Sequence, residues 1–395
     1  MASFVSSNDN RFYVALETAY GQVSAVSTRS RIPAVKLTTR QQTERAQRRD
    51  KTGTRTYPGD PKGLRRLTSF GMKTYLTGWT DKTREPEYGP LFQACLGSPA
   101  TIWPGGTILP MAPQSTRMTF TSPHGLAPFV AVSYRGEIRF VTNIVDSLTV
   151  LVNAPFLNAP TKQIPPTEKI YATANYMPAN DLPSLSIFDY WSPASAVQRL
   201  LSGAAINEMK VNVNGDFHEF EFSGGAADLV DSASFEQGQA GLTQYPEEPP
   251  IQPLNYSIIP GHLGQVWLGS TPSNFCTLTK AQLTVTNDLD LRNHEFGCPL
   301  AKGVSPGIRT VSLDFSLFEK DTDETKALYT AARNRIPISV MLQLGQQTGE
   351  MFGIYVQNVV PEVPEFDDSE RRLQWHFPNC RAEGGINDEL FVAFG

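Results

Sequence analysis

The side chains that most often carry chemistry are scattered along this chain. Histidine binds metals or transfers protons, but the five histidines show no H-E-x-x-H pattern and no other metal-ligand spacing. We therefore interpret them as surface residues or buried structural residues. They are His124, His218, His262, His294 and His376.

Acidic residues cluster at positions 321–324 and again at 367–370. A calcium loop needs twelve residues with a central glycine and a final glutamate, and the first cluster lacks this pattern. Acids near a helix start interact favourably with the helix dipole, so the first cluster predicts the capped start of a helix. The second cluster is typical of a solvated turn between strands.

Nucleophile, phosphate and thiol motifs are also absent from the sequence. There is no G-x-S-x-G elbow, P-loop or G-x-G-x-x-G loop, and residues 223–226 predict a bend or bulge. The cysteines form no C-x-x-C pair, which disfavours a zinc site or disulfide framework and fits a reducing compartment. We predict no catalytic, cofactor or metal site, and no enzyme. The cysteines are Cys95, Cys276, Cys298 and Cys380.

The strongest chemical signal is a basic, polar loop at residues 40–62. From Arg29 to Lys73 the chain has thirteen Lys or Arg residues and three acids, so this stretch carries +10 while the whole chain carries −5. A loop of this length is usually functional or disordered. Two interpretations stay open: a solvated loop, or an arm that docks on an acidic face of a neighbouring subunit. The docking candidates are Arg40, Arg45, Arg48, Arg49, Lys51 and Arg55.

Length and composition indicate how many domains the chain forms and whether it can bury a core. The 395 residues suit two or three domains, and 40% apolar residues suffice for buried cores. The 30 glycines and 30 prolines indicate many turns between short strands. No apolar run approaches the ~20 residues that span a bilayer, and residues 1–9 lack a signal-peptide pattern, so we expect no membrane contact.

The same order of expected elements occurs twice: strand, long loop, strand, short helix, three strands. Alternating apolar and polar residues mark the strands, most clearly at 311–317. In the first half the expected segments are 33–39, 63–68, helix 88–96, 185–190, 206–213 and 217–223. Their counterparts are 279–285, 307–312, helix 323–334, 338–344, 353–360 and 373–380. We interpret this agreement as a duplication.

The two helices carry the apolar stripes expected of helices packed on sheets. The first helix places its apolar residues at i, i+3, i+4, i+7 and i+8 and closes at Gly97. The second helix starts at a cap formed by Asp321 or Thr322, and Pro337 prevents it from continuing. Their predicted buried residues are Tyr88, Leu91, Phe92, Cys95 and Leu96 in the first, and Leu328, Ala331 and Ala332 in the second.

An insert is expected within the first half, and a linker is expected between the two halves. Residues 111–166 have their own strand pattern, with a two-residue hairpin turn predicted at Arg135-Gly136. Five prolines between Pro246 and Pro260 predict a stiff, extended linker. The expected division is 1–110 plus 167–245 for the first domain, 111–166 for a small β insert, 246–262 for the linker and 263–395 for the second domain.

The order of these features resembles that of siphophage-type tail tube proteins, the major tail proteins of long-tailed bacteriophages. The insert is similar to small β modules that decorate phage structural proteins, with residues 124–126 and 138–141 most alike. The resemblance rests on Leu16-Glu17-Thr18-Ala19-Tyr20-Gly21, the arm ending at Gly53, the run from Gly63 to Gly97, the segment 217–224 and the finish Asn387-Asp388-Glu389-Leu390.

The resemblance implies a mainly β fold of two tandem tail-tube-like β-sandwich domains, each with one short flanking helix, plus the small β insert domain. It implies a structural virion protein that forms stacked rings in the tail, after assembly in the host cytoplasm. Two domains per chain imply pseudo-hexameric rings of three chains, with a homohexamer as the alternative. Residues 40–62 would bridge adjacent rings.

The resemblance also implies partners. These are other copies of the chain and the tail terminator, tape measure and distal tail proteins. Viral DNA would pass through the lumen during genome ejection without specific binding, helped by acids lining the channel, because like charges repel. Alternatives are a tail terminator, a distal tail protein or a minor capsid protein, or, in another class, a DNA-binding module that uses the basic segment.

Overall fold

Strands dominate the chain. The computed structural model describes residues 4–45, 50–60, 63–159, 168–254, 256–369 and 371–395. Strands account for 44% and helices for 7% of residues, which confirms the expected mainly β class. None of the helices in these ranges is long and apolar enough to cross a membrane.

The described part of residues 10–231, here the N-terminal half, contains sixteen strands and one α-helix. The strands of its main sheets are β1 (Asn10–Leu16), β2 (Arg31–Ile32), β3 (Ala34–Thr43), β4 (Arg66–Tyr75), β5 (Thr101–Trp103), β12 (Thr173–Tyr176), β13 (Leu185–Trp191), β14 (Arg199–Val213), β15 (Glu219–Ala226) and β16 (Asp228–Asp231). The strands β6 (Gly106–Ile108) and β11 (Glu168–Ile170) form a separate two-stranded sheet. The helix is α1 (Gly89–Leu96), and the insert holds β7 (Arg117–Thr119), β8 (Ala131–Tyr134), β9 (Glu137–Ile144) and β10 (Thr149–Val152).

Residues 264–394, here the C-terminal half, contain the remaining strands and α2 (Asp323–Asn334). Outside this half, short 3-10 helices lie at Thr28–Ser30 and Gln239–Gly241. The strands are β17 (Gly264–Gly269), β18 (Ser273–Asn274), β19 (Leu278–Thr286), β20 (Asp290–Leu291), β21 (Val304–Ser305), β22 (Thr310–Phe318), β23 (Ile338–Leu344), β24 (Phe352–Val360), β25 (Glu365–Asp367), β26 (Gln374–Ala382) and β27 (Phe391–Phe394).

The order of hydrogen-bonded neighbours is the same in both halves. The N-terminal order is β1–β13–β14–β15–β4–β3, and the C-terminal order is β17–β23–β24–β26–β22–β19. Minor strands also correspond, since β2 pairs with β1 as β18 pairs with β17, and β16 pairs with β14 as β27 pairs with β24. The division into two tandem sandwich domains remains a prediction that this pairing order favours.

Shared β-bulges align the halves residue by residue. The β3–β4 register shifts between Ala34 and Lys36, and the β19–β22 register shifts between Leu278 and Lys280. Superposing these bulges matches Lys36 with Lys280 and Thr68 with Val311. The sequence alignment of the repeat was therefore wrong by two residues in the first strand and by one in the second, because alternation with a period of two and few identical residues do not fix the register between the halves.

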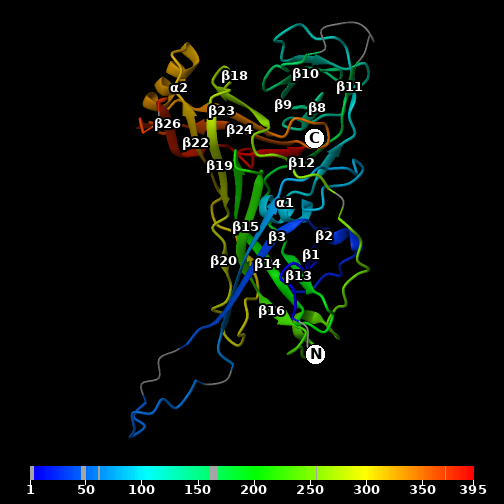
Figure 1. Cartoon of the computed structure of the whole chain (residues 1–395), viewed down its shortest axis with the longest axis vertical. Coiled ribbons are helices and arrows are strands. Elements are labelled where there is room, and N and C mark those ends of the chain that lie inside the picture. The colour runs from blue at the N-terminus through cyan, green and yellow to red at the C-terminus, as the bar shows by residue number, and fades with distance from the viewer. Residues whose placement is uncertain (1–3, 46–49, 61–62, 160–167, 255, 370) are drawn as a thin grey trace.

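Both helices lie where the apolar patterns predict. All five predicted residues of α1 are buried, and Thr322 caps α2 by accepting a hydrogen bond from the Thr325 amide at 3.4 Å. Leu328, Ala331 and Ala332 of α2 are buried as expected. The ring of Phe92 packs between sheets of both halves, 5.2 Å from the ring of Phe220 and 5.5 Å from that of Phe352. The helix α1 therefore lies at the junction of the halves, whereas α2 lies at the far end of the C-terminal half (Figure 1).

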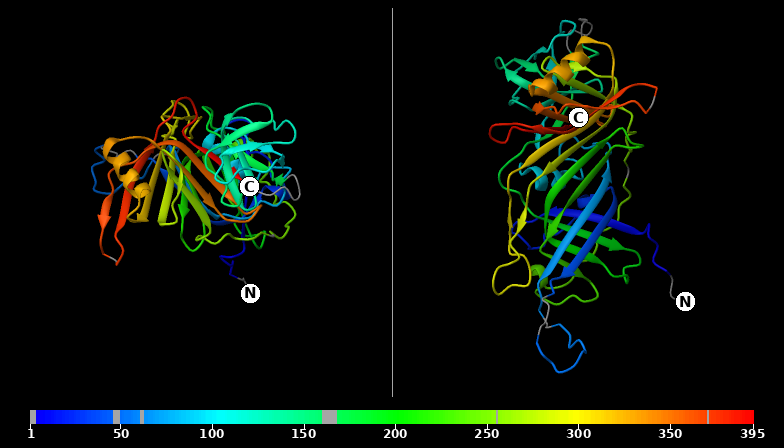
Figure 2. Two further views of the ribbon diagram at one scale, coloured as in Figure 1. Left: turned by 90° about the horizontal axis from the view of Figure 1, so that it is seen from above. Right: turned by 90° about the vertical axis from the view of Figure 1, so that its left-hand side faces the viewer.

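One sheet runs across both halves. The second part of β14 pairs antiparallel with β19, from Glu208 opposite Thr286 to Val213 opposite Ala281. The strands β3–β4–β15–β14–β19–β22–β26–β25 thus form one continuous path, coloured from blue through green and yellow to orange-red in Figure 2. On the other layer β27 pairs with β12, so the halves also share a second sheet and a single core.

The insert is a four-stranded antiparallel sheet in the order β7–β10–β9–β8. The predicted hairpin turn is confirmed, since Tyr134 pairs with Glu137 and both Arg135 and Gly136 have positive φ. Although the insert interrupts the N-terminal half, it packs on the C-terminal half, with the ring of Phe140 stacked 5.5 Å from that of Tyr355.

Candidate assembly surfaces

The basic loop forms an arm that leaves the body between β3 and β4 (Figure 1). Its sequence is mostly polar and has no apolar stripe that could pack on a core. Gly53 and Gly59 adopt positive φ within it. The hairpin continues further than expected, because β3 runs to Thr43 before the arm begins. The loop boundary at residue 40 was therefore wrong: residues 40–43 extend the ladder with β4, where backbone pairing does not require apolar side chains.

The candidate docking residues fall in two places. Arg40 lies in β3, opposite Ser69 of β4. Arg45, Lys51 and Arg55 lie on the exposed arm. The two remaining candidates, Arg48 and Arg49, lie outside the described residues.

The arm carries weak internal interactions. The Nε atom of Arg45 lies 3.5 Å from the carboxylate of Asp60, but its side chain is 75% exposed. Exposed ion pairs of this kind contribute about 0–1 kcal/mol. The base of the arm is held more firmly, since Arg66 donates its amide to the carbonyl of Pro299 at 2.9 Å. The arm is thus anchored at its base and leaves its charges accessible.

The strand β3 forms one end of the continuous sheet. Among the described residues it pairs only with β4, so its other edge presents unpaired backbone groups. Edge strands of this kind recruit further strands. The basic side chains on this edge strand are Lys36 and Arg40, and both are exposed.

The strand β25 forms the opposite end of the same sheet. Glu365, Phe366 and Asp367 pair with β26 and are all exposed, with Phe366 at 58%. The ring of Phe366 stacks on that of Trp375 at 5.5 Å and 10°. This strand was not predicted, and Asp367 was interpreted as part of a solvated turn; the local signal is the alternation Glu-Phe-Asp, and three residues are too few to identify a strand.

Between these ends, the joint of β14 and β19 is closed and buried. Val211 and Leu283 lie opposite each other with no exposed surface. On the polar side, the amide of Gln282 donates to the Oδ1 atom of Asn212 at 2.6 Å. Asn287 donates to the carbonyls of Ile206 and Cys95, which ties the C-terminal half to both β14 and α1.

The outer face of the joined sheet is polar and has paired charges. The Nζ atom of Lys73 lies 2.6 Å from the carboxylate of Glu219 and 3.6 Å from that of Glu221. The Nζ atom of Lys210 lies 2.8 Å from the carboxylate of Glu208. Lys73 and Lys210 on this face therefore have carboxylate neighbours.

The segment 16–21, which carries part of the family resemblance, contains the buried carboxylate of Glu17. The Glu17 side chain accepts hydrogen bonds from the hydroxyls of Ser184 and Ser186 and from the amides of Gly21 and Gly203, at 2.7–2.9 Å. Burial raises the pKa of Glu17 above its ordinary value. The side chain joins the end of β1 to β13 and β14, so its role here is to position strands.

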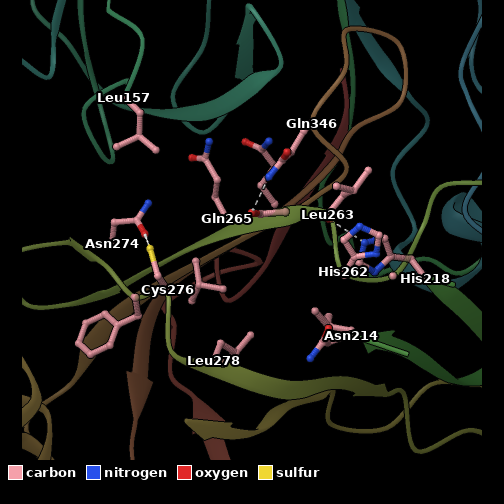
Figure 3. A pocket seen from close by; sticks show the side chains of 16 residues that line it. Leu157, Asn214, His218, His262, Leu263, Gln265, Asn274, Cys276, Leu278 and Gln346 are labelled. Carbon is pink, nitrogen blue, oxygen red and sulfur yellow. Dashed lines mark hydrogen bonds between the residues drawn. The ribbon is translucent and has the colours of Figure 1, made fainter. Parts of the chain in front are cut away.

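A pocket of about 350 Å³ lies where the two halves and the insert meet (Figure 3). The Nε2 atom of His218 hydrogen bonds with the carbonyl of Leu263 at 2.9 Å, and the thiol of Cys276 lies 3.1 Å from the Oδ1 atom of Asn274. These contacts provide no nucleophile–base pair. Within the described ranges, no three metal-binding side chains gather in one place. The absence of catalysis stays a prediction.

Comparison with known proteins identifies no relatives that would assign a function. No protein-family model matches the chain, and no curated protein matches it significantly.

Proposed function

We propose that this chain is a structural subunit of a bacteriophage tail tube, and that it assembles into stacked pseudo-hexameric rings of three chains. The main support is the strand order that occurs twice, with the two copies joined edge to edge inside the chain. A chain built in this way leaves one open edge at each end of its sheet. Edges at opposite ends are satisfied when successive chains join head to tail and close a ring.

The arm gives the rings a means to stack. It extends from one end of the body and keeps Arg45, Lys51 and Arg55 exposed (Figure 1). Arginine pairs bidentately with carboxylates, and the chain outside the basic stretch is strongly acidic. The proposal places the arm against an acidic surface of the adjacent ring.

The polar face of the joined sheet suits the lining of a DNA channel. A channel must not hold the phosphate backbone, and free lysines would do so. Here Lys73 and Lys210 have carboxylates within 4 Å, which weakens the attraction of these two lysines for phosphate. In this proposal the protein acts without catalysis or cofactors, in the virion tail, beside terminator, tape measure and distal tail proteins.

Electron microscopy of the purified protein at increasing concentration tests the proposal. Long hollow tubes are expected. Single closed rings would instead fit a tail terminator or distal tail protein, and a protein that stays monomeric but binds DNA in a salt-sensitive manner would fit the DNA-binding alternative.

A further inference from the structure

We propose that neighbouring chains join through β3 of one chain and β25 of the next, in the register that β14 and β19 use inside the chain. This inference rests on the proposed ring assembly and names its contact surface. The occupant of each open edge is therefore a second copy of this chain.

The first step is that β3 corresponds to β19. Each pairs with the first strand after its long loop, β4 or β22, and each ladder has the same bulge. The alignment that follows matches Thr38 with Gln282, Thr39 with Leu283, and Arg40 with Thr284. In the chain β19 continues into β14 on its other side, whereas β3 has no strand there among the described residues.

The second step is that β25 corresponds to the far part of β14. The strand β14 pairs with β15, and β25 pairs with β26 in the equivalent place. Val211 lies opposite Phe220 just as Phe366 lies opposite Trp375. The β14 segment has β19 on its other side, whereas the other side of β25 is open in the described chain.

The internal register can then be transferred between chains. Inside the chain Lys210, Val211 and Asn212 lie opposite Thr284, Leu283 and Gln282. The same register places Glu365 opposite the neighbour's Arg40. It also places Phe366 opposite Thr39, and Asp367 opposite Thr38.

The chemistry of the two edges matches in this register. Residues directly opposite in an antiparallel pair have Cβ atoms about 4.5–5.5 Å apart, so Glu365 and Arg40 would form a cross-strand ion pair. Asp367 would lie diagonally between Lys36 and Arg40. Phe366, which is 58% exposed on the inner side of its strand, would be covered as the equivalent Val211 is covered inside the chain. An acidic edge with one aromatic residue therefore meets a basic edge.

Disulfide trapping tests the register directly. In a background with Cys276→Ser and Cys298→Ser, a Thr38→Cys chain is mixed with an Asp367→Cys chain under mild oxidation. A cross-linked dimer is expected. Thr284→Cys, on the middle of the same sheet face, replaces Asp367→Cys as the matched control and should give no dimer. Equal cross-linking with the control would overturn the register.

Charge exchange provides a second test that leaves the fold intact, because both side chains are exposed. Glu365→Arg alone and Arg40→Glu alone should each raise the protein concentration needed for assembly, roughly fivefold for one cross-strand pair. The double variant should restore assembly toward the original concentration. Additive losses in the double variant would overturn the pairing.

Failure of the joint can be distinguished from failure of the tube function. Tubes that form without the disulfide overturn the joint and leave the function standing. Cross-linked closed rings that never stack support the joint and contradict the tube. Folded protein that neither associates nor cross-links at any concentration overturns both.

Discussion

The closed joint inside the chain and the open edges at its ends are built from corresponding strands but have different surfaces. At the joint, Val211 and Leu283 are fully buried. At the open ends, the corresponding Phe366 and Thr39 are partly exposed, and charged residues flank them. Corresponding backbone positions are thus buried at the joint and open to solvent at the ends of the sheet, where Lys36, Arg40, Glu365 and Asp367 are exposed.

This difference predicts two kinds of mutational effect. Changes at contacts formed within the chain should lower the free energy of unfolding of the monomer. Changes at the open edges or on the arm should leave the monomer stable and affect only assembly. Both effects can be measured on the same purified protein.

The largest contrast is expected between Val211→Asp and Phe366→Asp. A charge at the buried Val211 has no partner in the joint, so the free energy of unfolding should fall by more than about 4 kcal/mol. The same change at the exposed Phe366 should cost about 1 kcal/mol or less and block assembly. Urea denaturation of both variants checks the contrast, which fails if they are equally destabilised.

A second contrast is between Arg139 and Arg135, which lie in the same hairpin of the insert. Arg139 contacts the C-terminal half, whereas Arg135 is exposed. Arg139 is fully buried, pairs with Glu137 at 2.5 Å and donates to Gln265 at 3.0 Å; burial lowers its pKa to about 10. Arg139→Ala should cost about 3–5 kcal/mol because the buried carboxylate of Glu137 loses the positive charge that compensates it and keeps only neutral donors, the amides of Leu157 and Asn158.

Arg135 is the matched control, since its ion pair with Glu168 is exposed. Arg135→Ala should change the free energy of unfolding by less than about 1 kcal/mol. Similar losses in both variants, measured by denaturant titration, would show that the buried pair does not hold the insert on the C-terminal half.

His218 gives the junction of the halves a pH dependence. Burial lowers the pKa of His218 below its ordinary 6.5. The unfolded chain therefore binds this proton more readily, so the stabilising contribution is present above about pH 6.5 and declines as the pH falls toward the lower folded pKa. Denaturation at pH 7.5 and 5.5 should show a smaller decline in His218→Asn than in the control His294→Asn, which changes an exposed histidine away from His218. Equal declines would contradict this assignment.

The smallest effect on the monomer is expected for the arm. Arg45→Glu combined with Arg55→Glu should change the free energy of unfolding by less than about 0.5 kcal/mol, because both side chains are exposed. The same variant should not form tubes, because its arm would repel an acidic surface. Normal tubes seen by electron microscopy would contradict the role of the arm in stacking.

Much of the local structure could be predicted from the sequence. The alternation at 311–317 lies in β22, the stripe from Tyr88 to Leu96 is buried in α1, and Arg135-Gly136 turns a hairpin. These features depend on the period of apolar side chains and on backbone preferences of a few adjacent residues, which a single sequence contains.

Long-range contacts could not be predicted in the same way. The β14–β19 joint pairs residues 68 to 78 positions apart, and Arg139 joins the insert to Gln265. Neither leaves a local periodic signal. Alternation with a period of two did not fix the register between the two copies of the repeat, and Asp367 of the short β25 was interpreted as part of a turn. For this reason the open acidic edge was missing from the candidate surfaces.

The symmetry and strand contacts of one assembled ring test the central claim most directly. Cryo-electron microscopy of purified, assembled protein should show rings of three chains, with β3 of each chain beside β25 of the next. A tube or ring in which both edges remain exposed to solvent, or a chain that stays single at high concentration, would contradict the claim that this protein completes its sheet by joining its own copies.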